Sequence, residues 1–219
     1  KGATDRGDLL RENERFQKEI ERLQAEVAAQ QDASQRIQEL EALLQVKEGR
    51  PQDIFLFAEV IAQDTSNIRR LIAINRGTDD GLEEGMVLVS AGGSLVGAVS
   101  RVFKDFSWVT LITDTDSAVN ATVQLPSGEA RGIVVGNLRH GLSLEMVPPE
   151  VALAEGALVV TSGLGGNFPS GLLIGSVRSI ERKPQEPSQR AILEPAAPLS
   201  RLRGVLVLTS FVPARLQSP

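Results

Sequence analysis

The 219-residue chain lacks cysteine altogether and contains a single histidine, His140. The absence of cysteine excludes disulfides, thiolate catalysis and cysteine-ligated metals. No apolar run approaches the roughly 20 residues that a membrane-spanning helix needs. The net charge of −5 and the pI of about 5.1 leave no basic surface for nucleic acid or for an anionic membrane. The length still allows one large domain, or two small ones with an extension, to bury a hydrophobic core.

Glycine and proline are also missing from residues 8–48, a segment rich in Glu, Gln, Arg, Ala and Leu. This composition predicts one long helix, about 60 Å in length at 1.5 Å per residue. Apolar residues recur along it at alternating spacings of four and three, with one asparagine in the series. The series is Leu9, Asn13, Phe16, Ile20, Leu23 and Val27.

This series fits the seam of a coiled coil. With Leu9 at heptad position d, Asn13 falls at position a and is followed there by Ile20 and Val27. β-Branched residues at a with leucine at d favour a parallel two-stranded coiled coil, and an asparagine at a fixes its register. The N-terminal helix is therefore predicted to pair with a second copy of itself.

The seam is interrupted in its middle. It becomes polar at Gln30 and Ser34 and resumes at Ile37, displaced by the three-residue step of a stammer or a local break. A lone amphipathic helix lying on its own domain is the alternative. A seam this narrow would cover little of a globular core, so residues 8–48 are predicted to be a dimerisation helix.

The segment Gly49-Arg50-Pro51 ends the helix, and the chain after it alternates short apolar runs with glycine- and proline-rich turns. This pattern predicts strands grouped into small barrels or sandwiches. Residues 183–189 are expected to form a loop. The expected strands are 55–62, 69–75, 86–90, 94–102, 107–113, 119–125, 129–136, 142–147, 157–161, 172–178 and 203–211.

An internal repeat runs through the β region. Two copies of about 70–75 residues each, the size of a small β domain, indicate a duplication into two related barrels. The matching segments are 58–75 with 130–147, 84–102 with 155–180, and 108–123 with 190–207.

Turn chemistry predicts how the two copies are joined. Pro126-Ser127-Gly128 makes a tight turn between strands 119–125 and 129–136, so these two strands should pair. The last strand of copy one then belongs to the second barrel. By equivalence, strand 203–211 should return to pair with strand 55–62 in the first barrel.

The fold expected from these patterns is mainly β with an N-terminal α-helical coiled coil and two small, related β-barrel domains with interlocked end strands. The first barrel would span 52–113 plus 201–212, and the second would span 116–200. The edge strands of two open barrels would also offer sites for strand addition or self-association.

Two barrels in tandem are also the architecture of chymotrypsin-like proteases, which makes a hydrolase with Ser162 the enzymatic alternative. Such an enzyme needs its imidazole beside both a nucleophile and an orienting carboxylate. His140 instead lies in an expected hairpin turn, and Ser162-Gly163 lacks the Gly-Asp-Ser-Gly context of that family. No catalytic residue is therefore predicted.

Phosphate and metal sites are not predicted either. The glycines of residues 163–166 do not fit Gly-x-Gly-x-x-Gly, because Phe168 occupies the third glycine position. The acidic pairs Asp79-Asp80 and Asp114-x-Asp116 lack the distal bidentate glutamate of a calcium loop. The chain is thus expected to need no cofactor and no metal.

A loop in copy two is the candidate surface for a partner. Residues 163–171 form a longer insertion than in copy one, with Phe168 and Pro169 at its centre. An aromatic residue in a glycine- and proline-rich loop is a candidate for an exposed anchor. The candidate partner loop comprises Gly165, Gly166, Phe168 and Pro169.

Three motifs mark the chain from helix to second barrel. Leu10-x-Glu12-Asn13 heads the helix and Ile74-Asn75-Arg76-Gly77 forms a turn in copy one. The most specific motif is Thr161-Ser-Gly-Leu-Gly-Gly-Asn-Phe-Pro-Ser-Gly171. In this order they resemble the MreC family of rod shape-determining proteins, and the resemblance runs from about Leu9 to Leu208.

The resemblance implies a bacterial, non-enzymatic scaffold of the cell-elongation machinery on the extracytoplasmic face of the inner membrane. It implies one membrane helix upstream of Lys1 and self-association into dimers or filaments. It also implies binding to an elongation penicillin-binding transpeptidase, RodA, MreD and MreB, so that peptidoglycan synthesis maintains rod shape. The alternatives are a trypsin-like-fold periplasmic hydrolase and a periplasmic adaptor of the membrane-fusion type. In such an adaptor the helices form an antiparallel hairpin, whereas one long helix is expected here.

Overall fold

The computed structural model describes the backbone of residues 2–64, 69–126, 128–137, 139–181, 187–211 and 213–214. Within the helix, the described side chains are those of residues 12–34, 36–37, 40–41, 44 and 46. The chain divides into two compact units, Lys1–Glu41 and Ala42–Pro219, and the second unit holds all of the β structure.

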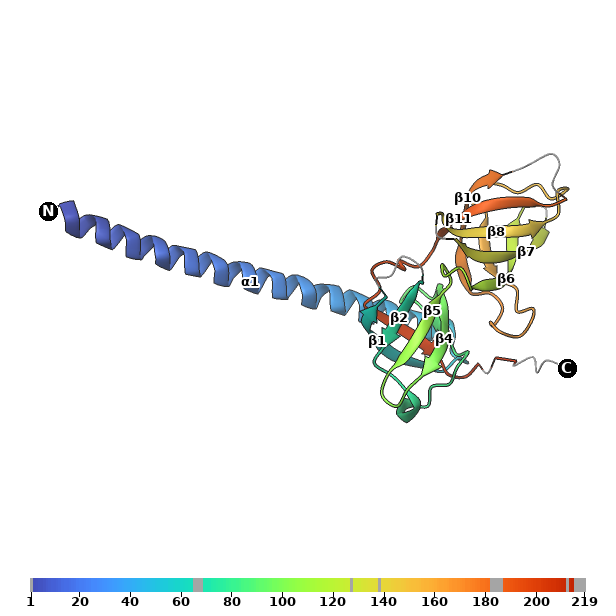
Figure 1. Ribbon diagram of the computed structural model, residues 1–219, viewed down its shortest axis with the longest axis horizontal. Helices are drawn as coiled ribbons and strands as arrows, with labels where there is room; N and C mark the ends of the chain where they lie inside the picture. Colours follow the sequence, from blue (N-terminus) through green and yellow to red (C-terminus); the bar gives the residue numbers. More distant parts are fainter. Residues whose placement is uncertain are drawn as a thin grey trace. The chain divides into compact units, whose positions relative to one another are not determined.

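Helix α1 (Gly2–Gly49) runs without interruption for 48 residues (Figure 1). The expected helix is therefore confirmed, and the polar stretch at Gln30 and Ser34 does not break it. The helix ends at Gly49, just before Pro51, because proline cannot continue the hydrogen-bond ladder. Its last turns belong to the second unit, where Val46 packs against the hydrophobic core.

Within the described chain, six strands close the first barrel in the order β1-β12-β3-β4-β5-β2, and neighbouring strands are antiparallel (Figure 1). A short 3₁₀ helix, η1 (Thr78–Asp80), lies in the connection between β2 and β3. The strands are β1 (Phe55–Gln63), β2 (Leu71–Ile74), β3 (Val87–Val89), β4 (Leu95–Val102), β5 (Ser107–Leu111) and β12 (Gly204–Leu208).

The second barrel repeats the first. Six described strands close it in the order β10-β11-β8-β7-β6-β9. The two cyclic orders match when each strand of the first barrel is replaced by its counterpart in the second. In the order given for the first barrel, the counterparts are β7, β6, β9, β10, β11 and β8. This match confirms the duplication. The strands are β6 (Ala118–Leu125), β7 (Gly128–Asn137), β8 (Gly141–Val147), β9 (Leu158–Thr161), β10 (Leu173–Glu181) and β11 (Gln189–Pro195).

Two expectations about the strands need correction. Both barrels are closed, so the described strands present no free edge, and the expectation of strand addition to open edges is wrong. Strand β11 was not expected as a separate strand, because proline and serine crowd its start. The repeat nevertheless indicates it, since Arg190 aligns with Trp108, and Trp108 lies in β5.

The exchange of end strands between the barrels is confirmed. Strand β12 lies between β1 and β3, with Phe55 opposite Leu208 and Glu59 opposite Gly204. Strand β6 lies between β7 and β9, with Leu125 opposite Gly128 across the tight turn. Each barrel is therefore completed by the final strand of the other copy.

The repeat preserves a close approach of two strands in each barrel. A Cβ atom added to Gly97 in β4 would lie 2.1 Å from the carbonyl oxygen of Thr110 in β5. A Cβ atom added to Gly175 in β10 would lie 2.1 Å from the carbonyl oxygen of Glu194 in β11. Only glycine fits at this point of either barrel.

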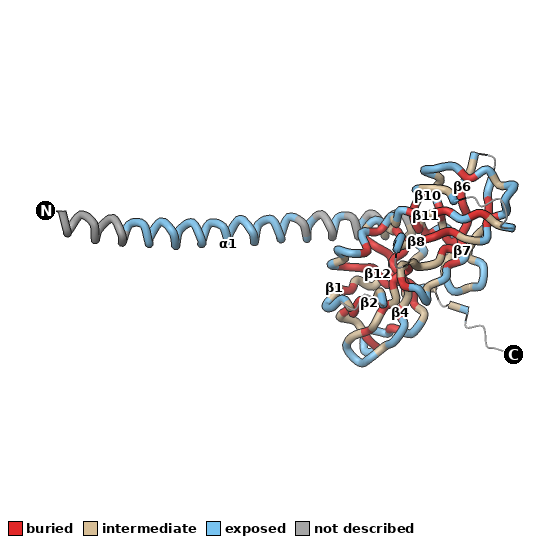
Figure 2. The backbone as a smooth tube through the Cα atoms, turned by 45° about the horizontal axis from the view of Figure 1, so that its top comes forward, coloured by how far each residue is buried: buried red, intermediate tan, exposed pale blue. Residues whose placement is uncertain are grey.

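The cores of the barrels consist of buried aliphatic residues, and Figure 2 shows buried positions along the strands of both barrels. Burial alternates along β5, as expected for a strand with one face toward a core. The largest fully buried side chains of the strands are Ile72, Ile74, Leu88, Leu95, Leu111 and Leu208 in the first barrel, and Leu142, Leu144, Ile174 and Leu193 in the second.

The chain crosses between the barrels twice, at residues 112–117 and 196–203. The first crossover is fixed by Asp114, which is fully buried. Its carboxylate accepts hydrogen bonds from the backbone N–H of Arg70 (2.6 Å), from Nε of Arg69 (3.3 Å) and from the backbone N–H of Asp116 (3.0 Å). The carboxylate thus ties the end of β5 to the start of β2.

Replacing Asp114 with alanine should destabilise the protein by about 3 kcal/mol, because three donors lose their buried charged acceptor. The matched control is Asp116→Ala, which removes an ion pair between Asp116 and Arg69 (3.1 Å) in which the Asp116 side chain is 66% exposed. This control should cost less than about 1 kcal/mol. Urea unfolding followed by Trp108 fluorescence measures both, and equal losses would contradict the role given to Asp114.

Candidate functional site

An exposed apolar stripe follows the predicted seam of α1. Phe16, Ile20, Leu23 and Val27 are each between 46% and 58% exposed. Asn13 is exposed on the same series, whereas the side chain of Leu9 lies outside the described residues. Half-exposed aliphatic and aromatic side chains at a and d spacing form a surface that a partner helix would cover.

The stripe continues past the polar interruption and is flanked by charged side chains. Ile37, Leu40 and Leu44 are also exposed, although the helix between the two parts is unbroken. Beside the stripe, the Arg22 guanidinium donates to the Glu19 carboxylate (2.8 Å) and lowers the pKa of that carboxyl. A narrow apolar line beside an ion-paired flank is the surface pattern of a coiled-coil helix.

The loop between β9 and β10 carries the candidate partner residues. Gly163, Gly165, Gly166 and Gly171 all have positive φ angles, between 68° and 81°. Left-handed backbone of this kind strains other residues, which explains why glycine recurs in this loop. The loop therefore has a defined path that the glycines make possible.

Two side chains, one at the end of β9 and one within β6, hold the loop in place. The Thr161 hydroxyl donates to the carbonyl of Pro169 (2.5 Å) and accepts from the backbone N–H of Leu172 (2.9 Å). From the neighbouring strand β6, the Asn120 side-chain amide donates to the carbonyl of Leu164 (3.0 Å). The loop is thus fastened at its base and at its side.

Phe168 does not lie as expected of an exposed anchor. It is half-buried and packs against the hydrophobic core. Its neighbour Pro169 is half-buried too, and its carbonyl accepts from Thr161. The exposed apolar side chain of the loop is Leu164, which is 50% exposed. The sequence pattern favours an aromatic residue as the anchor and gives no signal for Leu164.

Two distant segments also contact this loop. The backbone N–H of Ala214 donates to the carbonyl of Gly166 (2.9 Å), and Arg50 Nη2 donates to the carbonyl of Gly171 (3.1 Å). Pro213 lies against Gly85, the turn glycine before β3. A Cβ atom added to Gly85 would lie 3.2 Å from the proline ring. Nothing local in the sequence signals these contacts, because they join residues far apart in the chain.

The candidate catalytic residues occupy separate turns and make local hydrogen bonds. His140 is exposed between β7 and β8, and its backbone N–H donates to Oδ1 of Asn137 (3.4 Å). The Ser162 hydroxyl accepts from the backbone N–H of Leu164 (3.2 Å). Asp80 caps η1 by accepting from the backbone N–H of Gly77 (3.1 Å). The hydrogen bonds of Ser162, of Asp80 and of the turn at His140 thus serve to shape the backbone locally.

Acidic and histidine side chains do not converge in the part of the chain that the structure describes. No group of three or more His, Asp or Glu residues there is arranged to hold a metal ion. Among the same residues, α1 is too polar to span a membrane, and no other helix reaches the necessary length. What the described residues offer instead is exposed apolar surface, on the stripe of α1 and at Leu164 in the loop after β9.

Sequence comparison identifies relatives of the whole β region. A family model described as rod shape-determining protein MreC, barrel core, matches residues 60–209. The cell shape-determining protein MreC of Listeria monocytogenes is 30% identical over 214 residues, which cover 94% of this chain and 71% of that protein. The match thus includes both barrels and most of the helix.

Solved structures show the same fold. The crystal structure of MreC from Pseudomonas aeruginosa is 31% identical, with a TM-score of 0.63, and covers 71% of this chain and 99% of that one. MreC from Helicobacter pylori, solved in complex with the penicillin-binding protein PBP2, is 21% identical, with a TM-score of 0.55, over 72% of this chain and 98% of that one. By the family match over residues 60–209 and by these relatives, the chain belongs to the MreC family of rod shape-determining proteins.

Proposed function

We propose that this chain is the extracytoplasmic part of a non-enzymatic scaffold of the bacterial cell-elongation machinery. In this role it pairs through its helix and binds peptidoglycan-synthesis proteins to maintain rod shape. The observation that carries the proposal is the match of residues 60–209 to the MreC family, whose members are named for cell-shape determination. A membrane helix upstream of Lys1 would hold the scaffold at the inner membrane.

A scaffold role agrees with the local structural roles of Ser162 and of the turn that contains His140. The hydroxyl of Ser162 shapes the loop after β9, and His140 lies in a turn in which Asn137 binds the backbone. Among the described residues, no hydrogen bond joins Ser162, His140 and a carboxylate in the way that a Ser-His-Asp hydrolase requires. The single long helix likewise argues against an adaptor of the membrane-fusion type, which needs a helical hairpin.

Self-association would use the apolar stripe of α1. The residues Phe16, Ile20, Leu23 and Val27 lie at alternating a and d positions and would interlock with the same residues of a second copy. Asn13 at position a would fix a parallel register, because its amide is satisfied only opposite its own copy. Leu9 would extend the seam by one further d position.

The double substitution Ile20→Asp with Val27→Asp should abolish dimerisation, because it places four carboxylates in the two a layers on either side of Leu23. Light scattering with size exclusion would then give the mass of one chain instead of two. The matched control is Ala25→Asp with Ala28→Asp, which adds the same charge at the outward f and b positions. A dimer that survives the first pair, or dissociates equally with both pairs, would refute the seam.

Partner binding would use the loop after β9. A Helicobacter pylori relative with the same fold is solved with PBP2, which makes a penicillin-binding transpeptidase the first partner to test. The loop is held rigidly by Thr161 and Asn120 and presents Leu164 to solvent. A rigid, exposed apolar anchor loses little conformational entropy when a partner covers it. RodA, MreD and MreB are proposed as further members of the assembly from the family resemblance.

Leu164→Ser should weaken binding to a purified elongation transpeptidase by about tenfold or more, because it removes the exposed apolar anchor of the loop. Its free energy of unfolding should stay within about 0.5 kcal/mol of the parent. Phe168→Ala is the contrasting variant and should lower that free energy by about 1–3 kcal/mol, because Phe168 packs against the core. Calorimetric titration and urea unfolding measure the two effects. Unchanged affinity in Leu164→Ser would show that the loop is only structural.

A further inference from the structure

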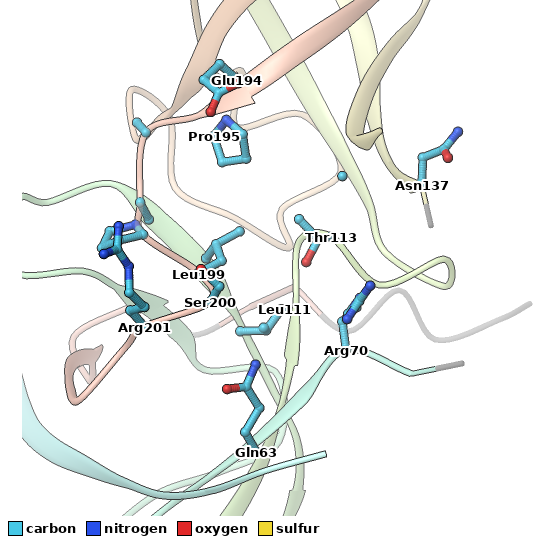
Figure 3. A pocket seen from close by; sticks show the side chains of 14 residues that line it. Gln63, Arg70, Leu111, Thr113, Asn137, Glu194, Pro195, Leu199, Ser200 and Arg201 are labelled. Carbon is cyan, nitrogen blue, oxygen red and sulfur yellow. The ribbon is translucent and has the colours of Figure 1, made fainter. Parts of the chain in front are cut away.

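A groove lies where the two crossovers run between the barrels. Its volume is about 550 Å³, within the range of about 300–1,000 Å³ that ligand pockets occupy (Figure 3). One wall contains Arg70 and Thr113, and the other is the segment 194–201. We call it the crossover groove, because it exists only where the chain passes from one barrel to the other.

Arg70 is held firmly on one wall. Its backbone N–H donates to the buried carboxylate of Asp114 (2.6 Å), and its carbonyl accepts from the backbone N–H of Leu111 (2.9 Å). The backbone N–H of Arg70 is therefore fixed to the first crossover, and its carbonyl is fixed to the end of β5. Only its side chain remains to interact with a ligand.

The opposite wall is equally well anchored. Ala197 and Leu199 point into the core and are 3% and 9% exposed. Two short turns shape the segment, because Leu199 N–H donates to the Ala197 carbonyl and Arg201 N–H donates to the Pro198 carbonyl (both 2.9 Å). Arg201 therefore projects from a fixed backbone, with the exposed Ser200 beside it.

The charge of the groove is not compensated from within. Among the described residues, the guanidinium groups of Arg70 and Arg201 have neither an ion pair nor a hydrogen bond. Glu194 at the rim faces Arg178 (3.8 Å), and Asp114 is already occupied by its three donors. Free guanidinium groups on fixed walls are suited to carboxylates, which they bind bidentately.

The arrangement of the two arginines indicates the shape of the ligand. Figure 3 draws Arg70 and Arg201 on opposite sides of Leu199 and Ser200, so their guanidinium groups do not converge on one point. A compact anion such as phosphate needs converging donors. An extended chain with carboxylates at intervals can reach both arginines along the groove.

We propose that the crossover groove binds an extended acidic peptide segment of a partner protein, with Arg70 and Arg201 pairing with its carboxylates. The inference rests on the proposed scaffold function in one respect, namely that the acidic peptide belongs to a partner protein. The chain as a whole carries a net charge of −5, so it repels an acidic peptide at long range. Binding of such a peptide therefore requires a local basic site.

The test uses fluorescein-labelled hexaglutamate with the full chain, followed by fluorescence anisotropy. Hexaglutamate should bind, labelled hexaglutamine should not, and the affinity should fall as salt rises. The variant Arg70→Ala with Arg201→Ala should bind at least about tenfold more weakly. The matched control is Arg101→Ala with Arg131→Ala, which removes the same charge from exposed arginines outside the groove and should keep the parent affinity.

Three results would overturn the proposal: no binding of hexaglutamate at low salt, equal losses in the two double variants, or full displacement by inorganic phosphate at equal concentration. The last result would assign the groove to a compact anion instead. Dimer mass and transpeptidase affinity are measured on the same Arg70→Ala, Arg201→Ala sample. If both persist while hexaglutamate fails to bind the parent, the groove proposal falls and the scaffold function stands.

Discussion

The rest of the structure depends on the exchange of end strands between the barrels. Strand β12 closes the first barrel between β1 and β3, and β6 closes the second between β7 and β9. Neither copy of the repeat can satisfy the backbone hydrogen bonds of its own barrel. The chain must therefore cross between the barrels twice, and these crossovers place both the buried Asp114 and the groove beside it.

Because both barrels are closed, the candidate binding surfaces lie on loops, on crossovers and on the helix. A closed barrel has no edge strand to offer, so partners must be met by loops and crossovers. The loop after β9 is shaped by glycines with positive φ, and it is fastened by Thr161 and Asn120. The apolar stripe of α1 is a separate exposed surface. The self-association and the partner binding proposed above would therefore use different elements of one chain.

Much of the fold follows from local chemistry that the sequence displays. The turn Pro126-Ser127-Gly128 and the repeat together predict the strand exchange, because a tight turn forces its flanking strands to pair. What could not be predicted depends on contacts between distant residues. Closure of the barrels, the partial burial of Phe168 and the position of Arg70 and Arg201 on the groove walls are set by tertiary packing, and no periodic pattern in the sequence indicates them.

If each barrel is completed by a strand from the other copy, neither can unfold alone. Native-state hydrogen exchange in rising urea tests this claim most directly, with β2 reporting on the first barrel and β8 on the second. The protected amides of both strands should converge on one unfolding free energy with one dependence on urea. Two separate limits, with one barrel exchanging through its own unfolding while the other stays protected, would contradict the account.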